Sequence, residues 1–432
     1  VPAVATQFDR VDEAWARIRS NQPLEALQPI EVEACPDGGV LVVGLAREQP
    51  GPSAYTPADV VLTKLDENGD LQWSESISAQ PVFISVYTGG RYVDAVVDAQ
   101  GETLLVMQAL SGSVLRRYGV NGSLMWSIDL PLHIVAGTYD WTDYAAGFVD
   151  LTPSGDIVVV GVAIQLSVPR FDIRTFTPDG SPLWEWRGDG GFIFQSSATG
   201  FPTGLAIGSN GHIYAHGLDD SPYFNGSGRV TVLDASGNFL WRHDEPTLDA
   251  PIVDVVFDAQ GRAVVASSFD NGVALSKFRP DGTEVFSSRQ VVPASLVGVS
   301  SIAIDAFDRI VVGGWQSPAS GLSPVPSVFR FSSAGTPTGI DVPSVVGPGE
   351  VGSVHKLAVT PRNDIVAFGV SGNGTDETFL ARFAPDGTER WAQERRGAQP
   401  LPTASRSVGL GLSVDPRGNL FTLAEIPLGG VP

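Results

Sequence analysis

The strongest constraint on the fold of this chain is an internal repeat, because repeated segments fold into repeated structural units. Seven times, a run rich in β-branched residues leads into a turn that carries a glycine, and a further strand-like run follows. In five copies a tryptophan follows the glycine at a spacing of four; these pairs are Gly69 and Trp73, Gly122 and Trp126, Gly180 and Trp184, Gly237 and Trp241, and Gly387 and Trp391. Phe286 replaces the tryptophan after Gly282, and the copy at Gly335 has no aromatic residue.

A second turn pattern alternates with the first. Asp98-Ala-Gln-Gly101 is typical of it, and in two copies Asp308 and Asn363 stand where the others have glycine. Both residue types tolerate turn conformations. The turn positions are 39, 101, 155, 211, 261, 308, 363 and 418. The mean step between them is about 54 residues, and each step holds two hairpins and therefore four short strands.

A four-stranded unit that repeats every roughly 40–60 residues is typical of a β-propeller blade. The apolar residues of runs such as Asp156-Ile-Val-Val-Val-Gly161 occupy both faces of a strand, so each sheet must pack against other sheets. We therefore predict an all-β fold, a β-propeller of eight four-stranded blades. The whole chain, 1–432, forms one domain in this prediction, with the repeats at 29–425.

Residues 1–28 admit two interpretations. The segment Phe8-Asp-Arg-Val-Asp-Glu-Ala-Trp15 resembles the repeat around Trp391, with Val11 in place of the turn glycine, so it is a candidate for strands that complete the last blade. Such closure leaves no loose edge strand. The segment from Asp9 to Ser20 also fits an amphipathic helix with Asp9 as its cap. The alternative fold is then a propeller of seven blades with an N-terminal helical appendage, or one of eight with an incomplete blade.

Charge and composition exclude several classes of protein. The formal net charge is −21, and a field of that sign repels nucleic acids and anionic membranes. No apolar run approaches the length of about 18 residues that a membrane span requires. Cys35 is the only cysteine, so neither an internal disulfide nor a thiolate metal cluster can form.

Two of the repeats carry a resemblance to a known family. Asp59-Val-Val-Leu-Thr-Lys-Leu-Asp-Glu-Asn-Gly-Asp-Leu-Gln-Trp73 and Phe379-Leu-Ala-Arg-Phe-Ala-Pro-Asp-Gly-Thr-Glu-Arg-Trp391 resemble the bacterial β-propeller repeat called SBBP. Asp415-Pro-Arg-Gly-Asn-Leu-Phe resembles the other hairpin of that repeat. The resemblance covers about residues 29 to 425. It implies a propeller that is exported or attached to the bacterial surface, hence extracellular, periplasmic or cell-surface. It implies no activity.

Long segments between the hairpins are the predicted place of a binding site, because function concentrates on loops. They lie at roughly 44–59, 74–92, 127–146, 185–202, 313–327, 339–354 and 392–406. Several carry aromatic residues, which favour contacts with peptides and sugars. The candidate binding residues are Tyr87, Tyr139, Trp141, Tyr144, Phe192, Phe194 and Trp315. The repeat tryptophans Trp73, Trp126, Trp184, Trp241 and Trp391 are assigned structural roles in packing between blades.

The sequence favours a non-enzymatic binding or scaffold protein with a protein or glycan partner. It contains no nucleophile elbow and no metal-ligand cluster, so we expect no catalytic residue and no cofactor. Calcium is the one cofactor left open, because Asp66-Glu-Asn68-Gly-Asp70 imitates the start of a calcium loop; it lacks the glycine at the sixth and the glutamate at the twelfth position, and it coincides with a repeat turn. The alternative is a lyase or hydrolase that uses loop carboxylates and arginines, such as Arg187, Asp244 and Glu245, in a central funnel. The sequence makes no prediction about oligomeric state.

Overall fold

In the computed structural model, each repeat forms one antiparallel sheet whose strands follow one another in chain order. The described residues form seven four-stranded sheets and one two-stranded sheet. They contain no helix that is long and apolar enough to cross a bilayer. The described ranges are 27–47, 58–77, 93–109, 112–131, 144–165, 168–188, 202–219, 227–245, 252–269, 271–292, 296–317, 324–347, 350–372, 377–395 and 411–423.

The sheets are the blades, numbered first to eighth in chain order, and each blade runs from an inner to an outer strand. The inner strands are β1 (Leu27–Ala34), β5 (Val93–Val97), β9 (Tyr144–Leu151), β13 (Pro202–Ile207), β17 (Asp254–Phe257), β21 (Leu296–Ile304), β25 (Val351–Val359) and β29 (Gly411–Val414). The second strands are β2 (Val40–Arg47), β6 (Thr103–Ala109), β10 (Ile157–Gln165), β14 (Ile213–Asp219), β18 (Ala263–Phe269), β22 (Ile310–Ser317), β26 (Ile365–Gly372) and β30 (Leu420–Leu423). The third strands are β3 (Ala58–Leu65), β7 (Gly112–Tyr118), β11 (Val168–Phe176), β15 (Ser227–Leu233), β19 (Gly272–Phe278), β23 (Val325–Phe331) and β27 (Glu377–Phe383). The outer strands are β4 (Leu71–Ile77), β8 (Leu124–Pro131), β12 (Pro182–Arg187), β16 (Phe239–Asp244), β20 (Glu284–Val291), β24 (Pro337–Asp341) and β28 (Glu389–Arg395).

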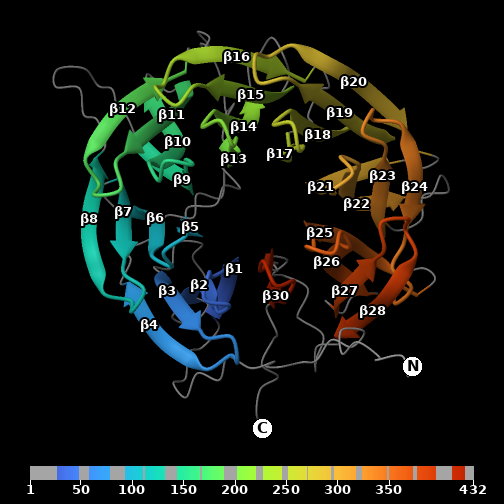
Figure 1. Cartoon of the computed structure of the whole chain (residues 1–432), viewed down its shortest axis with the longest axis horizontal. Coiled ribbons are helices and arrows are strands. Elements are labelled where there is room, and N and C mark those ends of the chain that lie inside the picture. The colour runs from blue at the N-terminus through green and yellow to red at the C-terminus, as the bar shows by residue number, and fades with distance from the viewer. Residues whose placement is uncertain are drawn as a thin grey trace, which may run out of the picture.

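The eight blades surround a common axis, with their first strands innermost (Figure 1). This arrangement confirms the prediction of a β-propeller. The last blade lies between the seventh and the first: the backbone N–H of Ala34 in β1 donates to the hydroxyl of Ser413 in β29 over 3.0 Å. The ring is therefore closed by contact between residues that are 379 positions apart in the chain. The interpretations of residues 1–28 as closing strands or as a helix concern residues that, up to 26, lie outside the described part.

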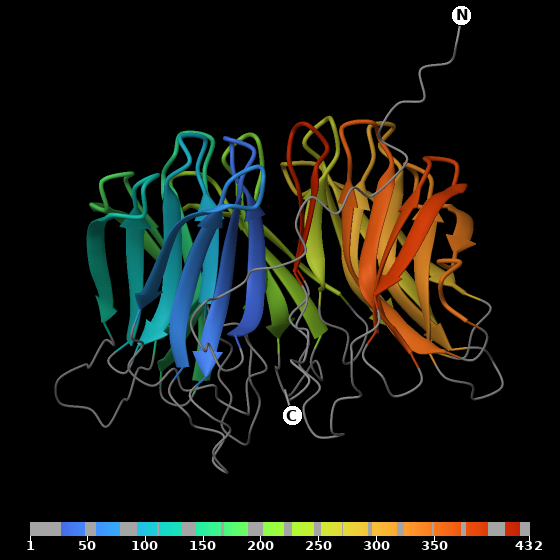
Figure 2. The same ribbon diagram turned by 90° about the horizontal axis from the view of Figure 1, so that it is seen from below.

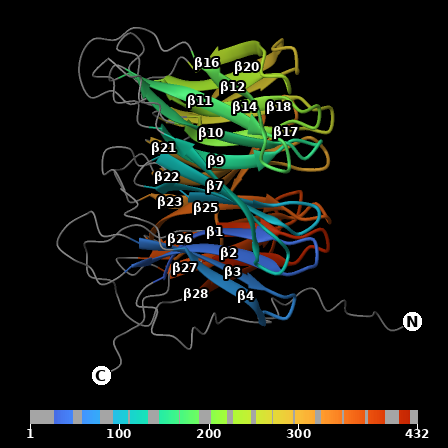
Figure 3. The same ribbon diagram turned by 90° about the vertical axis from the view of Figure 1, so that its left-hand side faces the viewer.

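Both kinds of hairpin turn lie on one face of the ring, which we call the turn face (Figure 2). Figure 3 shows the same separation from the side. In a typical turn, one carboxylate oxygen of Asp98 accepts the backbone N–H groups of Gln100 and Glu102. The connections between hairpins leave the strands at the opposite face, which we call the loop face. The structure thus separates a face of short, internally hydrogen-bonded turns from a face of long connections.

The core lies between adjacent blades rather than within any one of them. Leu41 and Leu62 of the first blade form one buried cluster with Leu105 of the second, and comparable clusters join other neighbouring blades. Middle strands are therefore apolar on both faces; all seven residues of β19 are buried. Removing a blade exposes both of its neighbours, which explains why the ring must close.

Four of the repeat tryptophans, Trp73, Trp126, Trp184 and Trp241, pack on the turn of the following blade. Trp73 of β4 lies under the turn at Gly122, and its indole Nε1–H donates to the carbonyl of Val120 over 3.0 Å. A Cβ added to Gly122 would lie 2.6 Å from the indole ring, and the φ of this glycine is +80°. Glycine is therefore required twice over at this position, for the left-handed turn and for the close approach of the indole. Trp184 and Trp241 make the corresponding hydrogen bonds.

The sixth blade, which has no repeat aromatic, uses an arginine from its third strand instead. The guanidinium of Arg330 lies against Gly387 in the turn of the next blade. Its Nη1 donates to the carbonyl of Asp386 over 2.7 Å, and its Nε pairs with Asp341 over 2.6 Å. A planar guanidinium can stack and donate hydrogen bonds as an indole does. Arg330 therefore makes the contact between blades that a tryptophan makes in the other repeats.

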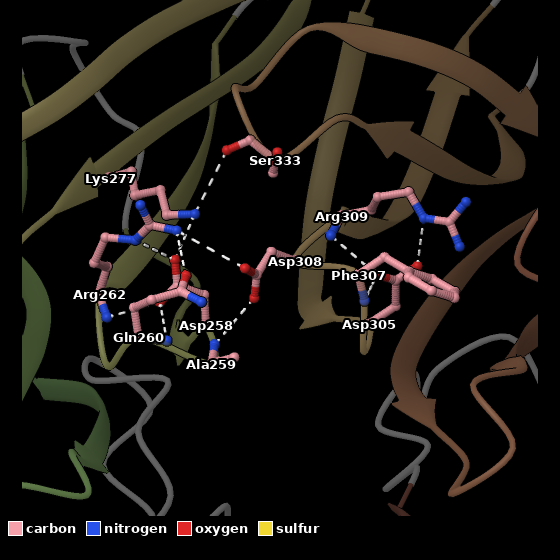
Figure 4. A network of polar contacts seen from close by, with 10 residues as sticks. All are labelled: Asp258, Ala259, Gln260, Arg262, Lys277, Asp305, Phe307, Asp308, Arg309 and Ser333. Atoms are coloured by element: carbon pink, nitrogen blue, oxygen red, sulfur yellow. Dashed lines mark hydrogen bonds and ion pairs between the residues drawn. The ribbon is translucent and has the colours of Figure 1, made fainter.

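Buried ion pairs join the third strand to the inner turn of the same blade. The penultimate residue of the third strand supplies the cation, and Lys277 pairs in this way with Asp258 over 2.6 Å, both side chains being almost fully buried. Figure 4 shows this pair together with Arg262, which also contacts Asp258. Similar pairs join Arg117 to Asp98 and Arg382 to Asp364, both buried, and Lys64 to Asp37, whose carboxylate is half-exposed. In the third blade, threonines occupy both places, Thr152 and Thr175.

The two departures from glycine in the inner turns have a structural reason. Asp308 and Asn363 adopt φ values of 57° and 66°, which these residue types tolerate. Their side chains reach back to the preceding blade: Asp308 accepts the N–H of Ala259 over 3.0 Å (Figure 4), and Asn363 accepts the N–H of Ala306 over 2.6 Å. A glycine there would lose a link between blades.

Loss of one partner from the buried pair is expected to be much worse than loss of both. Lys277→Thr removes the buried cation and leaves Asp258 paired only with the partly exposed Arg262, so we expect the free energy of unfolding to fall by about 1–3 kcal/mol. The double variant Lys277→Thr with Asp258→Thr reproduces the third blade, where the Thr152 hydroxyl accepts the turn N–H of Asp156. Urea denaturation should show the double variant to be more stable than the single one. A double variant as unstable as the sum of two singles contradicts this account.

A substitution at Val11 separates the two interpretations of the N-terminal segment. If the segment forms closing strands, Val11 stands at a turn position that prefers a left-handed conformation, and Val11→Gly should raise the melting temperature. If it forms a helix, the same change should lower the free energy of unfolding by about 0.5–1 kcal/mol. The sign of the shift, measured by thermal denaturation, decides between them, with Val11→Ala as the control for lost side-chain volume.

Candidate functional site

Most of the predicted binding aromatics lie outside the part of the chain that the structure describes. These residues are Tyr87, Tyr139, Trp141, Phe192 and Phe194. Tyr144 is the first residue of β9, and its side chain is not among those described. Their grouping in a binding surface therefore stays a prediction. The described strand ends do show that the connections carrying them leave from the same face.

Trp315 is the exception, and the prediction that it lies in a loop is wrong. It belongs to β22, where it pairs with Gly298 of β21 and is half-buried. The preceding glycines suggested the end of a strand, but they serve close packing. A Cβ on Gly313 would lie 2.7 Å from Val354 of the next blade, and one on Gly314 would collide with the carbonyl oxygen of Gly298. Trp315 therefore covers Gly298 instead of standing in a binding loop.

The charged residues of the enzyme alternative also occupy the wall rather than the centre. Arg187 ends the outer strand β12, and its Nε pairs with Asp172 over 3.3 Å. Asp244 ends β16 and pairs with Arg229 over 2.6 Å, and Glu245 pairs with Arg289 over 3.3 Å. These pairs hold strands and blades together, so they do not form a central funnel site.

The inner strands carry a different set of titratable residues. Each inner strand is followed by a residue that opens its turn, for example Cys35 or Thr152. We count positions on the inner strand back from this residue and call each such position a level. Glu33 and Asp150 both lie two residues before that turn, in the first and third blades. At this level the other blades have neutral residues, namely Val96, Ala206, Val256, Ala303, Ala358 and Ser413. Glu33 and Asp150 are half-buried.

Polar side chains that lie two residues further from the turn accept hydrogen bonds from the free edges of neighbouring inner strands. Glu31 accepts the backbone N–H of Ala95 over 3.1 Å, and Asp94 accepts that of Val149 over 2.8 Å. The hydroxyl of Ser301 accepts the N–H of Leu357 over 3.1 Å. The inner strands have no further strand beside them, and such an edge exposes unpaired N–H groups. These side chains satisfy several of them across the interface between blades.

Burial changes the acid–base properties of the axial carboxyls. The pKa of Glu33 rises to about 8, first through burial and then through repulsion from Glu31 and Asp150, while attraction to Lys356 opposes the rise. Burial raises the pKa of Asp150 to about 6, although the N–H of Leu151 donates to its carboxylate and opposes the rise. At neutral pH, Glu33 is therefore a carboxylic acid and Asp150 largely a carboxylate.

A positively charged side faces these carboxyls. Lys356 of β25, in the seventh blade, acts electrostatically on Glu33 of the first blade. His355 stands beside Lys356, and burial together with the lysine charge lowers its pKa, so the imidazole is neutral at pH 7.

A buried histidine stands at the interface of the fourth and fifth blades. His216 of β14 is 1% exposed, and its Nδ1 lies 3.2 Å from the hydroxyl of Thr203. Its Nε2 has no hydrogen-bond partner and lies 3.9 Å from the carboxylate of Asp254, at the start of β17. Burial lowers the pKa of His216, so the imidazole is neutral at pH 7 and this pair carries one negative charge.

The described residues contain no group of three or more histidine, cysteine, aspartate or glutamate side chains arranged to hold a metal ion. In the turn that imitates a calcium loop, a carboxylate oxygen of Asp66 accepts the N–H groups of Asn68 and Asp70. This oxygen stabilises the turn, as in the other repeats. Burial raises the pKa of the Cys35 thiol to about 11, so it is not a reactive nucleophile.

Sequence reasoning missed the axial carboxyls because the inner strands were interpreted only as apolar runs. The signal was present: once the copies are aligned on their turns, Glu33 and Asp150 are the only charged residues in a column of small or apolar ones. An acidic residue at a repeat position where the other blades have small or apolar residues therefore indicates a buried titratable group.

Comparisons with known proteins support the fold alone. No family model matches this sequence, and no curated protein matches it. The solved structure of puromycin hydrolase is similar with a TM-score of 0.50 and 16% identity; the match covers 93% of this chain and 58% of that one. A protein from Lactobacillus plantarum matches over 87% of this chain and 98% of its own, with 11% identity and a TM-score of 0.47. A Synechocystis apocarotenoid oxygenase matches over 90% and 97%, with 13% identity and a TM-score of 0.45.

The pH dependence of stability tests the buried state of Glu33. Because its pKa is higher in the folded protein than in the unfolded chain, its contribution to stability is complete below about pH 4.5 and is lost as the pH rises through 8. Glu33→Gln should therefore stabilise the protein at pH 9 relative to wild type, by at least about 1.4 kcal/mol, the equivalent of one pKa unit. At pH 4 the two proteins should be equally stable.

Denaturant unfolding at pH 9 and at pH 4 measures the difference in stability between Glu33→Gln and wild type. Glu284→Gln, at an exposed residue of the outer strand β20, controls for the loss of one negative charge. An equal effect of the two substitutions at pH 9 would refute the buried carboxyl.

Proposed function

We propose that this chain is a non-enzymatic binding protein that recognises a protein or glycan partner through its loop face. The observation that carries the proposal is the direction of the strands. The segments after β4, β8 and β12 leave from consecutive blades at the same face, and they are the segments that contain the predicted aromatic residues. Aromatic side chains from three neighbouring blades suit a shared surface for a peptide or a sugar.

The turn face is less suited to recognition. Its turns use their side-chain oxygens internally, as Asp98 and Asp258 do with the N–H groups of their own turns. The loop face has the long connections on which binding usually occurs.

We further propose that the repeats are of the SBBP type and that the protein is exported to the periplasm, the cell surface or the medium. The support is the resemblance of the repeats around Trp73 and Trp391, together with a single buried cysteine that places no demand on the redox compartment.

Substitution of loop-face aromatics tests the proposed surface. Tyr139→Ala and Trp141→Ala should each weaken binding to a glycan array or to a purified partner by about tenfold or more, as expected for a hot-spot aromatic. Phe307→Ala is the matched control, because Phe307 is an aromatic residue of the turn face with 67% exposure. If Phe307→Ala abolishes binding and the other two variants bind normally, the recognition surface lies on the wrong face.

A second candidate function is an enzyme whose active site lies at the axis. It is favoured by one observation: Glu33 holds a proton at neutral pH while Asp150 is largely ionised, and such a pair can act as general acid and general base. A screen of hydrolase and lyase substrates tests this candidate. An activity that survives both Glu33→Gln and Asp150→Asn rules out the axial carboxyls as its acid and base.

A further inference from the structure

Two histidines lie in one row of the fourth blade, on the face that packs against the fifth. His216 of β14 and His243 of β16 are both register partners of Val230 in β15, the strand between them, so their side chains share one face of the sheet. His216 Nδ1 lies 3.4 Å from the carbonyl oxygen of Ile252, and the ring centroid of His243 lies 4.7 Å from that of Phe278. Both histidines therefore belong to the interface between these two blades.

The fold does not require a histidine at the position of His216. His216 is the fourth residue of the second strand of its blade, and every other blade has an apolar residue at this position. These residues are Val43, Val106, Val160, Ala266, Gly313, Phe368 and Leu423. The strand partner of His216 is Gly204, on which a Cβ would lie 2.4 Å from the imidazole. The fourth blade thus uses a glycine to make room for a histidine where apolar residues suffice elsewhere.

Each of the two histidines presents its Nε2 to a carboxylate. Within the described residues, neither Nε2 atom has a hydrogen-bond partner. The Nε2 of His216 lies 3.9 Å from Asp254, and that of His243 lies 3.5 Å from Glu245. The carbonyl of Ile252 can only accept a hydrogen bond, so we assign the proton of the neutral His216 ring to Nδ1 and a lone pair to Nε2. A proton added to Nε2 turns this contact between two acceptors into an ion pair.

A proton on His216 brings a charge into a buried place. The side chain of His216 is 1% exposed, whereas that of Asp254, which faces it, is 41% exposed. Burial lowers the pKa of His216, and attraction to Asp254 opposes this change. The stability that the neutral histidine provides is therefore complete above about pH 6.5, the ordinary value, and is lost as the pH falls through the lowered pKa.

His243 acts on an ion pair that links the two blades. The carboxylate of Glu245, in the fourth blade, is almost fully buried and pairs with Arg289 of the fifth over 3.3 Å. His243 precedes Glu245 by two residues and lies on the same side of the sheet. Once protonated, His243 pairs with Glu245 and repels the guanidinium of Arg289. A contact within one blade then replaces a contact between two blades.

The other groups around the histidines keep their charge at mildly acidic pH. The titratable and charged groups that face them within the described residues are Tyr214 and Glu245 of the fourth blade and Asp254 and Arg289 of the fifth. Burial raises the pKa of Tyr214 to about 12, so this residue stays neutral. Burial raises the pKa of Glu245, but the contacts with His243 and Arg289 lower it further, to below its ordinary value. Histidine is the side chain whose charge ordinarily changes between pH 5 and pH 8.

We propose that the interface between the fourth and fifth blades is an acid-sensitive contact, which opens before the other interfaces of the ring when His216 and His243 take up protons. The two protonations act in the same direction. The first places a charge in a buried site, and the second withdraws Glu245 from Arg289. The contact responds to pH by itself, independently of recognition at the loop face.

Hydrogen exchange of the full chain, measured by mass spectrometry at pH 5.5 and pH 7.5, tests the proposal. Exchange rates divided by the intrinsic rate at each pH report how often a segment opens. The amides of β14 and β17 should open at least about tenfold more often at pH 5.5 than at pH 7.5, tenfold being the effect of one pKa unit. The amides of β5 and β6, in the second blade, should show no such increase.

Variants identify the groups responsible. His216→Val introduces the residue of the first three blades, and His243→Gln introduces the residue found at the equivalent position 393 of the seventh. The double variant should lose the increase at pH 5.5. His243→Gln alone, at a position that is less buried, should reduce it and tests the proposal even if His216→Val does not fold. His355→Gln, at a half-buried histidine of the seventh blade, should behave as wild type does.

Three results overturn the proposal. The first is equal opening of β14 and β17 at the two pH values. The second is an increase of the same size in β5 and β6, which indicates that acid destabilises the whole ring. The third is an increase that persists in the double variant, or in His243→Gln at its full size.

Discussion

Every blade of this propeller is stable only between two others, and the rest of the structure follows from that constraint. Both faces of the middle strands are apolar, so a sheet alone would expose Leu62 on one blade and Leu105 on the next, which the ring instead buries in one cluster. The blades are then fixed in register by directional contacts. Trp73 donates to a carbonyl of the next turn, Asp308 accepts an N–H of the preceding one, and Ser413 joins the last blade to the first.

The same constraint places charges at the axis. Inner strands have a free edge, and side chains such as Glu31 and Asp94 satisfy its N–H groups from the neighbouring blade. Carboxylates are good acceptors for this purpose, but they accumulate negative charge where eight strands approach one another. Within the described residues, Glu33 and Asp150 make no such contact with the edge of a neighbouring strand; burial raises the pKa of both, and for Glu33 the repulsion from Glu31 and Asp150 adds to it. Hydrogen bonds to the edges of neighbouring strands explain Glu31 and Asp94.

The spacing of glycines and tryptophans was sufficient to predict the propeller and its eight sheets, because turns and packing contacts recur at the same place in every blade. The sequence also marked the two turns without glycine, at Asp308 and Asn363, but not their purpose, since the acceptor roles depend on the neighbouring blade. Trp315 was misplaced because Gly313 and Gly314 look like a strand end, while their actual role is to admit Val354 and the backbone of Gly298. Glu33 and Asp150 could be found only by aligning the repeats, because their equivalence appears only when residues more than a hundred positions apart are compared.

The most direct test of the buried carboxyls Glu33 and Asp150 is a titration of their side-chain carboxyl carbons by nuclear magnetic resonance, on protein labelled selectively at glutamate and aspartate. Comparison with Glu33→Gln and Asp150→Asn assigns the two signals. The account predicts that Glu33 titrates with a pKa of about 8 and Asp150 with a pKa of about 6. Titration of Glu33 near its ordinary value of 4.5 would contradict the account, because the carboxyl would then be solvated rather than buried between the blades.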